Sequence, residues 1–350
     1  MVRTKKTTPR KHANTHGLTE QQKLRHIVES FSKVSILVMA DLIVDEFIYG
    51  EIARVSREAP VLILRHRDRR LIPGGGANAV MSLAALGVTA LPVGLVGDDE
   101  AGKALLQIFR KNKISISGIS KLKGHITTTK TRVLAYSAHS SRQQVVRIDR
   151  ECESLKDTHP SFVELVASAR EYAPAADAVL LSDYGYGAVS PRLFNFVRAK
   201  GLLGETPVTL DSRYRMLDYE GVTAATPNEG EVEEALHIKI GDGRETLLTA
   251  GAALLRHMKL ESLVITRGGD GMVAFEKKKA PLEIPIYGPN QVVDVTGAGD
   301  TVIATFTAAL AAGADAASAA RLANYAGGIV VMKRGTASVS RAELLAALEQ

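Results

Sequence analysis

The fold of this chain is decided by the stretch DVTGAGD at residues 294–300, which continues into TVIATF at residues 301–306. The two glycines predict a tight loop, because a residue without Cβ lets the backbone turn sharply and approach a ligand closely. The apolar run behind them predicts a buried helix, whose N-terminus offers unpaired N–H groups and a positive dipole end to a phosphate. Asp300 is then either the N-cap of that helix or a general base beside an anion site.

The composition is that of an ordinary globular protein with one large α/β domain or two smaller ones: 350 residues, 45% hydrophobic and 23% charged. The net charge of +6 arises largely in the first 25 residues, where seven lysines and arginines face one acid, Glu20. We therefore expect residues 1–21 to form a basic disordered tail, with a tail that binds an anionic partner as the alternative. The remainder is close to neutral, which argues against a nucleic-acid surface.

Nothing in the sequence suggests a membrane or secreted protein. No run approaches the roughly 20 apolar residues of a membrane span, and the basic tail lacks the apolar core of a signal peptide. Cys152 is the only cysteine, so neither a disulfide framework nor a cysteine metal site is expected. A reducing, cytoplasmic compartment fits this usage.

A short apolar run at residues 34–40 predicts a buried strand, and two carboxylates, Asp41 and Asp45, follow it. In open α/β sheets, ligands bind at the carboxyl ends of the strands. Either aspartate alternatively caps a turn; Asp45 is the better ligand candidate, since a carboxylate can accept hydrogen bonds from two sugar hydroxyls. The stretch PGGGAN at 73–78 then opens an alanine-rich helix, and is either a backbone site for a small polar ligand or a flexible linker.

Two segments, 47–72 and 122–149, contain alternating apolar and polar residues and predict antiparallel strands outside the main sheet. The second segment carries Lys130, Arg132 and Arg147, which form either a charged solvent face or a site for a substrate phosphate. Beyond it, predicted helices at 161–170, 191–199 and 246–258 alternate with predicted strands at 178–183, 207–211, 223–226 and 263–266. Such alternation implies a parallel sheet covered by helices on both faces.

Two further polar loops follow predicted strands. Asn228 and Glu231 lie one helical turn apart, either as the capped start of a helix or as oxygen ligands of Mg²⁺, partly through water. TRGGDG at 266–271 is either a hairpin turn or a loop against nucleotide phosphates. It is not a Walker A loop, because no Gly-Lys-Ser/Thr follows, and the first strand lacks the Gly-x-Gly-x-x-Gly of dinucleotide dehydrogenases.

Together these stretches resemble the ribokinase/PfkB-like carbohydrate kinases, from about Val34 to the C-terminus. The most specific marks are GGGAN at 74–78 and DVTGAGD at 294–300, in the expected order and separation. Within that family the chain is most similar to the kinase domain of bacterial heptose-7-phosphate kinase/adenylyltransferases, through the stretches at 54–61, 129–133, 146–151, 181–185 and 335–340. Ala40 departs from the usual glycine, and Asp211-Ser212-Arg213 departs from the usual Asp-Pro-Lys, which puts that loop's contacts in question. No His-x-Gly-His nucleotidyl-transfer motif is present, so no adenylyltransferase half is expected.

The resemblance implies a ribokinase-like three-layer α/β/α sandwich over residues 22–350, with a mainly parallel central sheet. Residues 47–72 and 122–149 would form a small β-sheet lid, through which relatives often pair as homodimers. The implied cofactors are ATP and Mg²⁺, with K⁺ in some members.

The resemblance also implies a role for individual residues. The catalytic group would be the base Asp300 with the amides of Gly297, Ala298 and Gly299. The sugar would be bound by Asp45, Gly75, Gly76 and Asn78, and its 7-phosphate by Lys130, Arg132 and Arg147. The nucleotide would be lined by Asn228, Thr266, Gly269, Gly271 and Asn324. Mg²⁺ would lie near Asn228 and Glu231, and a monovalent cation near Asp294 and Thr296.

The implied activity is ATP-dependent phosphorylation of D-glycero-β-D-manno-heptose 7-phosphate at O1, a step towards ADP-heptose for the lipopolysaccharide core. One alternative is a PfkB-like kinase of another sugar, sugar phosphate or nucleoside. An alternative of another class is a non-catalytic sugar- or nucleotide-binding regulator on the same fold. The presence of Asp300 with the whole glycine loop speaks against a regulator.

Overall fold

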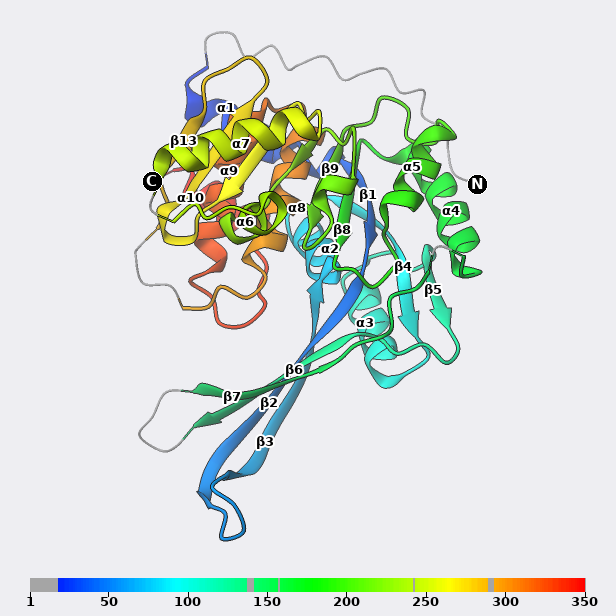
Figure 1. The fold of residues 1–350 in the computed structure, drawn as a ribbon, viewed down its shortest axis with the longest axis vertical. Helices are drawn as coiled ribbons and strands as arrows, with labels where there is room; N and C mark the ends of the chain where they lie inside the picture. The colour runs from blue at the N-terminus through cyan, green and yellow to red at the C-terminus, as the bar shows by residue number, and fades with distance from the viewer. Residues whose placement is uncertain (1–17, 137–141, 157, 242, 289–292, 350) are drawn as a thin grey trace.

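The structure is a computed structural model that describes residues 18–136, 142–156, 158–241, 243–288 and 293–349. A large sheet carries helices on both faces, and a smaller sheet projects from one end of it (Figure 1). This is the three-layer α/β/α sandwich with a small lid that the sequence predicts. Within the described residues, no helix combines the length and the apolar character needed to span a bilayer.

The main sheet is built from strands distributed along the whole chain. Its strands are β1 (Ser35–Ala40), β4 (Thr89–Gly97), β5 (Ile119–Leu122), β8 (Ala178–Asp183), β9 (Val208–Ser212), β10 (Ala224–Ala225), β11 (Ser262–Thr266), β12 (Met272–Glu276) and β13 (Leu282–Ile284). Their order is β13-β12-β11-β10-β9-β8-β1-β4-β5. Pairing is parallel from β5 to β11, and only the β11-β12-β13 edge is antiparallel.

Helices cover both faces of this sheet because its central strands are apolar on both sides. The helices are α1 (Glu20–Glu29), α2 (Gly76–Ala85), α3 (Glu100–Lys111), α4 (Ser161–Tyr172), α5 (Pro191–Ala199), α6 (Glu229–Leu236), α7 (Arg244–His257), α8 (Ala298–Ala311), α9 (Ala316–Val330) and α10 (Arg341–Ala347). Along β1, Ile36 and Val38 face the core under α2, α8 and α9, whereas Leu37 and Met39 face the core under α4, α5 and α7. All four side chains are buried, so this strand is the centre of the domain.

The first helix begins inside the segment predicted as a tail. α1 begins at Glu20, and its N-cap Thr19 and Gln22 form a reciprocal capping box. Helical structure is therefore present slightly before the predicted start at Gln22. Residues 1–17 of the predicted tail lie outside the described residues.

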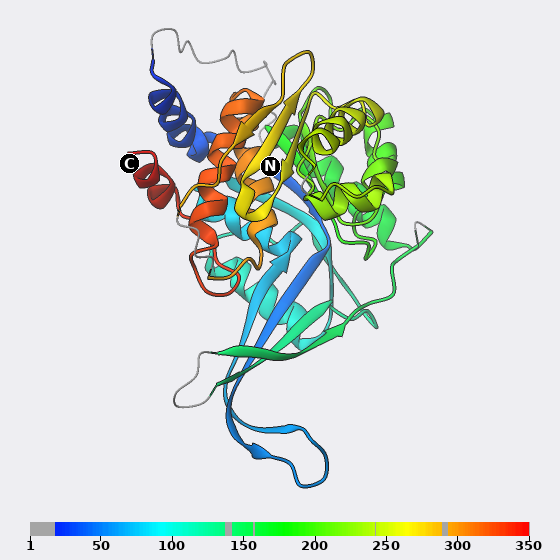
Figure 2. The same ribbon diagram turned by 60° about the vertical axis from the view of Figure 1, so that its left-hand side comes forward.

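The lid is a twisted four-stranded sheet. Its strands are β2 (Leu42–Val55), β3 (Leu62–Gly75), β6 (Thr129–Tyr136) and β7 (Gln143–Arg150), in the order β3-β2-β6-β7. β2–β3 and β6–β7 are antiparallel hairpins, as predicted, but β2 and β6 pair in parallel, which the sequence analysis did not foresee. Figure 2 shows the β2–β3 hairpin reaching furthest from the body. Only Asp41 separates β1 from β2, so the lid grows directly out of the central strand.

The strand order places a crevice at the carboxyl ends of the central strands of the main sheet. From β1 the chain runs to β4 and β5 on one side and then returns to add β8 on the other. Ligands in open α/β sheets bind at such a switch point, outside the carboxyl ends of the strands. Asp41 follows β1, Asp183 ends β8, and α8 packs against both β8 and β9.

Candidate active site

Asp300 lies in the first turn of α8 and is not its N-cap. Gly297 caps the helix with a φ of 78°, a left-handed conformation that favours glycine. The carboxylate of Asp300 is 4% exposed. Its Oδ2 accepts a hydrogen bond from Asn78 Nδ2 (3.0 Å), and its Oδ1 accepts one from the Tyr184 hydroxyl (2.8 Å). The capping alternative for Asp300 is therefore wrong, and two side chains fix the carboxylate.

The surroundings tune Asp300 for proton transfer near neutrality. Burial raises the pKa of Asp300 to about 7, the hydrogen bonds from Asn78 and Tyr184 oppose this rise, and the charges of Asp45 and Glu231 add to it. A general base works best when its pKa lies near the operating pH. The site therefore supplies a better base than an unperturbed aspartate with a pKa near 4.

Two adjoining cavities flank the glycine loop. The first, of about 250 Å³, is polar and is lined by Asp300, Gly297 and Gly299 together with acids from other elements. The second, of about 170 Å³, is mainly apolar and lies between the 268–271 turn and helices α8 and α9. Thr266 and Gly299 line both, so one continuous cleft runs past the start of α8.

The second cavity brings together four of the five predicted nucleotide residues, and the fifth, Asn228, lines the polar cavity. The second cavity is lined by Thr266, Gly269, Gly271 and Asn324. The 266–271 stretch does form a hairpin turn between β11 and β12, one of its two predicted alternatives, and also borders the cleft. Asn324 donates from Nδ2 to the carbonyl of Pro285 (2.8 Å), which fixes the amide at the cavity wall.

Asp45 is held at the base of the lid, close enough to Asp300 for its charge to raise the pKa of that base. Its Oδ1 accepts a hydrogen bond from Arg132 Nη1, and its Oδ2 accepts one from the Thr336 hydroxyl (3.1 Å). A Cβ at position 74 would lie 2.6 Å from Asp45 Oδ2, so the glycine there allows this approach. The neighbouring Gly75 has a φ of 51° and caps α2.

Residues from β2 and the start of α2 thus converge on the Asp300 carboxylate at the start of α8. Asp45, Gly75, Gly76, Asn78 and Asp300 lie together although the sequence places Asp300 more than 200 residues after Asn78. The profile of the pfkB family carbohydrate kinases matches residues 39–343, which contain all of them. The chain belongs to the pfkB family of carbohydrate kinases. It is an ATP-dependent phosphotransferase of that family.

Curated relatives of this kinase share more than a third of its residues. The bifunctional protein HldE of Geobacter sulfurreducens is 38% identical over 332 residues, and that of Pelobacter propionicus is 36% identical over 334 residues. Each alignment covers 94% of this chain and 66% of the relative, so the chain spans just under two thirds of their length.

Solved structures share the fold at low sequence identity. Arabidopsis thaliana ribokinase complexed with ribose and ATP superposes with a TM-score of 0.69 at 20% identity, covering 91% of this chain and 99% of that one. Escherichia coli phosphofructokinase-2 in complex with substrates and products gives 0.72 at 16% identity, covering 91% and 100%. These likenesses establish the ribokinase-like fold of the kinase.

Asn228 and Glu231 form the capped start of α6, the first of their two predicted alternatives. Asn228 caps α6: its Oδ1 accepts from the Glu231 amide (2.9 Å), and its own amide donates to Glu231 Oε2 (3.0 Å). Both side chains also line the polar cavity, where Asp211 joins them. Burial raises the pKa of Glu231 and, more strongly, that of Asp211. Carboxylate and amide oxygens are the donors Mg²⁺ prefers, so this set fits the ion.

A further observation supports a polar ligand in this cavity. The Thr226 hydroxyl is buried, lines the cavity and has no hydrogen-bond partner among the described residues. Buried polar groups in proteins normally find a partner, so a bound ion's water or a phosphate oxygen would complete this one. The same cavity is also lined by Arg213, a cation opposite the acids.

The three lid cations predicted for a substrate phosphate already have acidic partners. Arg132 pairs with Asp45, and Arg147 makes two hydrogen bonds to Asp149 (2.8 and 2.7 Å). The Lys130 ammonium lies 3.5 Å from Asp149 and 3.3 Å from Glu151. A phosphate would therefore compete with these carboxylates for the cations.

Asp294 and Thr296 shape the loop that precedes α8. Asp294 Oδ1 accepts from the Thr296 amide (2.9 Å), and its Oδ2 accepts from the Gly335 amide (2.9 Å). Burial alone would raise the pKa of Asp294, but these amide donors bring it below its usual value. The two residues thus tie the glycine loop to the loop that carries Thr336.

Sequence reasoning missed Tyr184 and Asp183, which line the polar cavity. Asp41 accepts three backbone hydrogen bonds from the loop after β8, at Tyr184 (2.8 Å), Tyr186 (3.0 Å) and Ala188 (2.9 Å). Asp41 thus caps a turn, which is one of the two alternatives that the sequence predicted for it. Asp183 ends β8 and Tyr184 follows it, and this position at the carboxyl end of a strand was the signal in the sequence that could have identified them.

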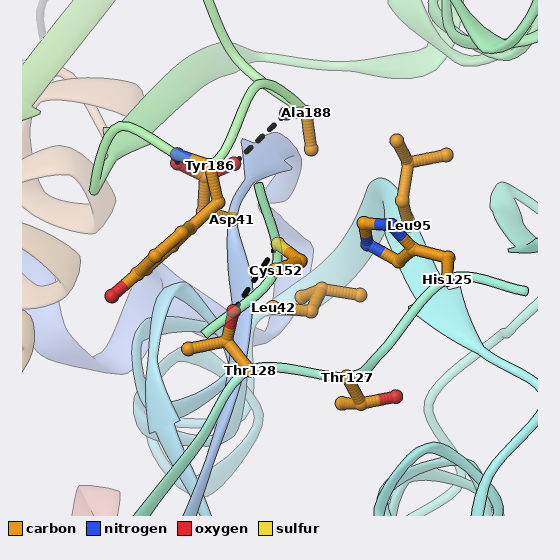
Figure 3. A pocket seen from close by; sticks show the side chains of 9 residues that line it. All are labelled: Asp41, Leu42, Leu95, His125, Thr127, Thr128, Cys152, Tyr186 and Ala188. Atoms are coloured by element: carbon orange, nitrogen blue, oxygen red, sulfur yellow. Dashed lines mark hydrogen bonds between the residues drawn. The ribbon is translucent and has the colours of Figure 1, made fainter. Parts of the chain in front are cut away.

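The described residues around Asp41 enclose only a small cavity. The cavity beside it measures about 10 Å³, which is room for about one water molecule (Figure 3). Cys152 lies in its wall with Sγ 3.4 Å from the Thr128 hydroxyl, and burial raises the pKa of the thiol. A raised pKa leaves less of the nucleophilic thiolate at neutral pH, so this setting does not activate Cys152.

Proposed function

We propose that this kinase transfers the γ-phosphoryl group of ATP to O1 of D-glycero-β-D-manno-heptose 7-phosphate, forming the 1,7-bisphosphate. The observation that carries the proposal is the position of the Asp300 carboxylate, pinned beside the left-handed glycine loop where the two cavities meet. The choice of sugar rests on the resemblance of the lid and loop stretches to heptose-7-phosphate kinase domains, together with the HldE relatives.

The reaction would proceed by proton removal and in-line transfer. Asp300 accepts the proton of the sugar O1 hydroxyl as the O1–P bond forms and the bond between the γ-phosphorus and the ADP oxygen breaks. The amide of Ala298 donates to Val295 O (3.2 Å), so the first turn of α8 chiefly offers the amides of Gly299 and Asp300 to the transferring group. Gly297 shapes this turn.

The nucleotide would lie across the two cavities. Its base fits the apolar cavity beside Asn324, and its phosphates would run past Thr266, Gly269 and Gly271 towards the start of α8. Bound at Asn228 and Glu231, Mg²⁺ would supply positive charge to the phosphates. Asp211 and Arg213 border the same space and would set its charge balance.

We further propose a monovalent-cation site, a lid dimer and a cytoplasmic location. Asp294 and Thr296 are the candidates for K⁺, a cation present in one structure of E. coli phosphofructokinase-2. β7 is exposed along its length and presents Val145, Val146 and Ile148 to solvent, which suits pairing with a second copy. E. coli phosphofructokinase-2 has a tetrameric form.

A second candidate is a kinase for an unphosphorylated sugar. It is favoured by one observation: Lys130, Arg132 and Arg147 are already neutralised by carboxylates. Asp45 with the 74–76 glycines would then bind sugar hydroxyls in the same place, and Asp300 would keep its role.

A coupled ADP-release screen over heptose 7-phosphate, fructose phosphates, ribose and nucleosides tests the proposal. We expect the highest kcat/KM with heptose 7-phosphate and a loss of this preference in Lys130→Ala and Arg147→Ala. Equal kcat/KM with unphosphorylated sugars would favour the second candidate. Failure of every acceptor in that screen would favour a non-catalytic regulator.

A further inference from the structure

The loop that follows β8 is fastened to the central strand of the sheet. Residues 184–188 donate three backbone N–H groups to one buried carboxylate, that of Asp41, which is 2% exposed. Figure 3 shows Asp41 between the backbone of Tyr186 and that of Ala188. Burial and the charge of Asp183 raise the pKa of Asp41 to about 7, and the three N–H donors oppose this rise because they favour the ionised form. The position of this loop is thus set by β1.

The first residue of the fastened loop reaches the catalytic base. The Tyr184 hydroxyl donates to Asp300 Oδ1 at 2.8 Å, and the residue lines the polar cavity. Its ring lies against Gly75, because a Cβ built at that glycine would be 3.1 Å from Tyr184 Cε2. Tyr184 therefore belongs to the loop held by Asp41 and contacts both Gly75, a predicted sugar-binding residue, and Asp300.

We propose that Tyr184 is a positioning residue for Asp300, and that Asp41 holds Tyr184 in place through the 184–188 loop. The inference rests on the base role of Asp300 in the proposed function. It does not depend on which sugar is the acceptor.

The geometry explains why such a residue is needed. The terminal torsion of an aspartate side chain has a broad preference, so the direction of its lone pairs is not set by the backbone. A carboxylate has about four lone-pair sites, and here Asn78 occupies one on Oδ2 while Tyr184 occupies one on Oδ1. With one donor on each oxygen, the plane of the carboxylate is fixed where Asp300 lines the polar cavity.

Tyr184 keeps its own proton in this role. Burial and the nearby charge of Asp300 raise the pKa of the phenol well above its usual value, so the hydroxyl is a donor at all working pH values. Its hydrogen bond is stronger to the ionised carboxylate than to the neutral acid, and it therefore favours the form of Asp300 that can accept a proton.

Other charged groups also face Asp300. Asp45 on β2 and Glu231 on α6 disfavour the ionised form of Asp300. Burial and the charges of Glu231 and Asp300 raise the pKa of Asp211 on β9, and the charge of Arg213 opposes that rise. None of these groups is altered when the Tyr184 hydroxyl is removed. A shift in the titration of Asp300 on that change is therefore attributable to the lost hydrogen bond.

The test is Tyr184→Phe in the full chain, with the best acceptor found in the substrate screen. We expect kcat to fall about 10- to 100-fold with KM for ATP nearly unchanged, because a donor to a reacting group is lost while the apolar cavity proposed for the nucleotide base does not include Tyr184. The acid limb of kcat/KM should move up by about one pH unit, the size expected for one hydrogen bond to a charged group.

Two companion variants separate positioning from a structural effect. Tyr186→Phe removes a hydroxyl from the same loop that contacts Glu151 and Lys130, and should leave the acid limb in place. Asp41→Asn turns an amide N–H₂ towards the loop amides, and should move the limb in the same direction as Tyr184→Phe although Tyr184 remains.

A readout without turnover keeps the inference separable from the proposed function. The ¹³C carboxyl titration of Asp300 should shift to higher pH in Tyr184→Phe whatever the acceptor is. Wild-type kcat together with an unmoved titration midpoint would overturn the inference. A second outcome also overturns the inference: Asp300→Asn retains activity although Tyr184→Phe shifts the titration midpoint of Asp300. Asp300 would then not be the base, and its hydrogen bond with Tyr184 would have only a structural role.

Discussion

A methyl group added at Gly297 should damage both the fold and the catalytic base. In Gly297→Ala the new Cβ would lie 2.4 Å from Asn78 Nδ2, whereas ordinary contact begins at 3.4 Å. Asn78 must withdraw by on the order of 1 Å to relieve the overlap. Its 3.0 Å hydrogen bond to Asp300 Oδ2 would then lie beyond hydrogen-bonding distance.

Two costs add to give the expected loss of stability. Forcing a side chain into the left-handed conformation at residue 297, where φ is 78°, costs about 1–2 kcal/mol. Losing a hydrogen bond to a charged group costs about 1.5–3 kcal/mol. The free energy of unfolding should therefore fall by about 3–5 kcal/mol, and kcat should fall at least tenfold because Asp300 loses one of its two donors.

Gly299→Ala is the matched control two residues away. Its Cβ would have no atom within 4 Å apart from its immediate neighbours, and the residue is helical with no positive φ. Replacing a helical glycine with alanine stabilises by about 0.4–1 kcal/mol. Urea unfolding of both variants and steady-state kinetics of Gly297→Ala provide the measurements. If Gly297→Ala unfolds at the wild-type urea concentration and turns over normally, the coupling between the loop and Asn78 is refuted.

Three further predictions concern the base, the core of the site and the nucleotide cavity. The kcat/KM of the wild type should rise with pH through about 7 and level off above it, because Asp300 must lose its proton to act as base; a pH profile that is flat from 5 to 8 contradicts this. Asp183→Asn should lower the free energy of unfolding by about 3–5 kcal/mol in denaturant titrations, since the buried carboxylate pairs with Arg215, and a change within error would count against it. Asn324→Ala should raise KM for ATP about three- to tenfold with KM for the sugar unchanged, because the amide fixed on the carbonyl of Pro285 is lost; an equal rise in both constants would argue against a nucleotide role.

The parts of the fold that carry a local pattern were predictable from the sequence. α5 spans the predicted residues 191–199, and β8 spans the predicted residues 178–183, because each is an uninterrupted periodic or apolar run with clear ends. The parallel pairing of β2 with β6 was not predictable, since it joins strands that lie more than 80 residues apart and has no turn sequence of its own.

The same distinction applies to the site. The glycine loop and Asp300 were predictable because the loop, the helix start and the acid occur in one short stretch. The hydrogen bonds from Tyr184 to Asp300 and from the Tyr184 amide to Asp41 join residues 116 and 143 positions apart. Similarly, the sequence gives the charges of Lys130 and Arg147 but not the acids that pair with them, since pairing depends on lid register.

The central claim is that Asp300 removes the proton of the acceptor alcohol at the start of α8. The most direct measurement is the turnover of Asp300→Asn beside its ATP affinity from titration calorimetry. We predict that kcat falls by about 10²- to 10⁴-fold while the Kd for ATP stays within about threefold of wild type, because the amide has the shape of the carboxylate but cannot take the proton. Turnover at the wild-type rate, or loss of ATP binding in parallel with turnover, would contradict the account.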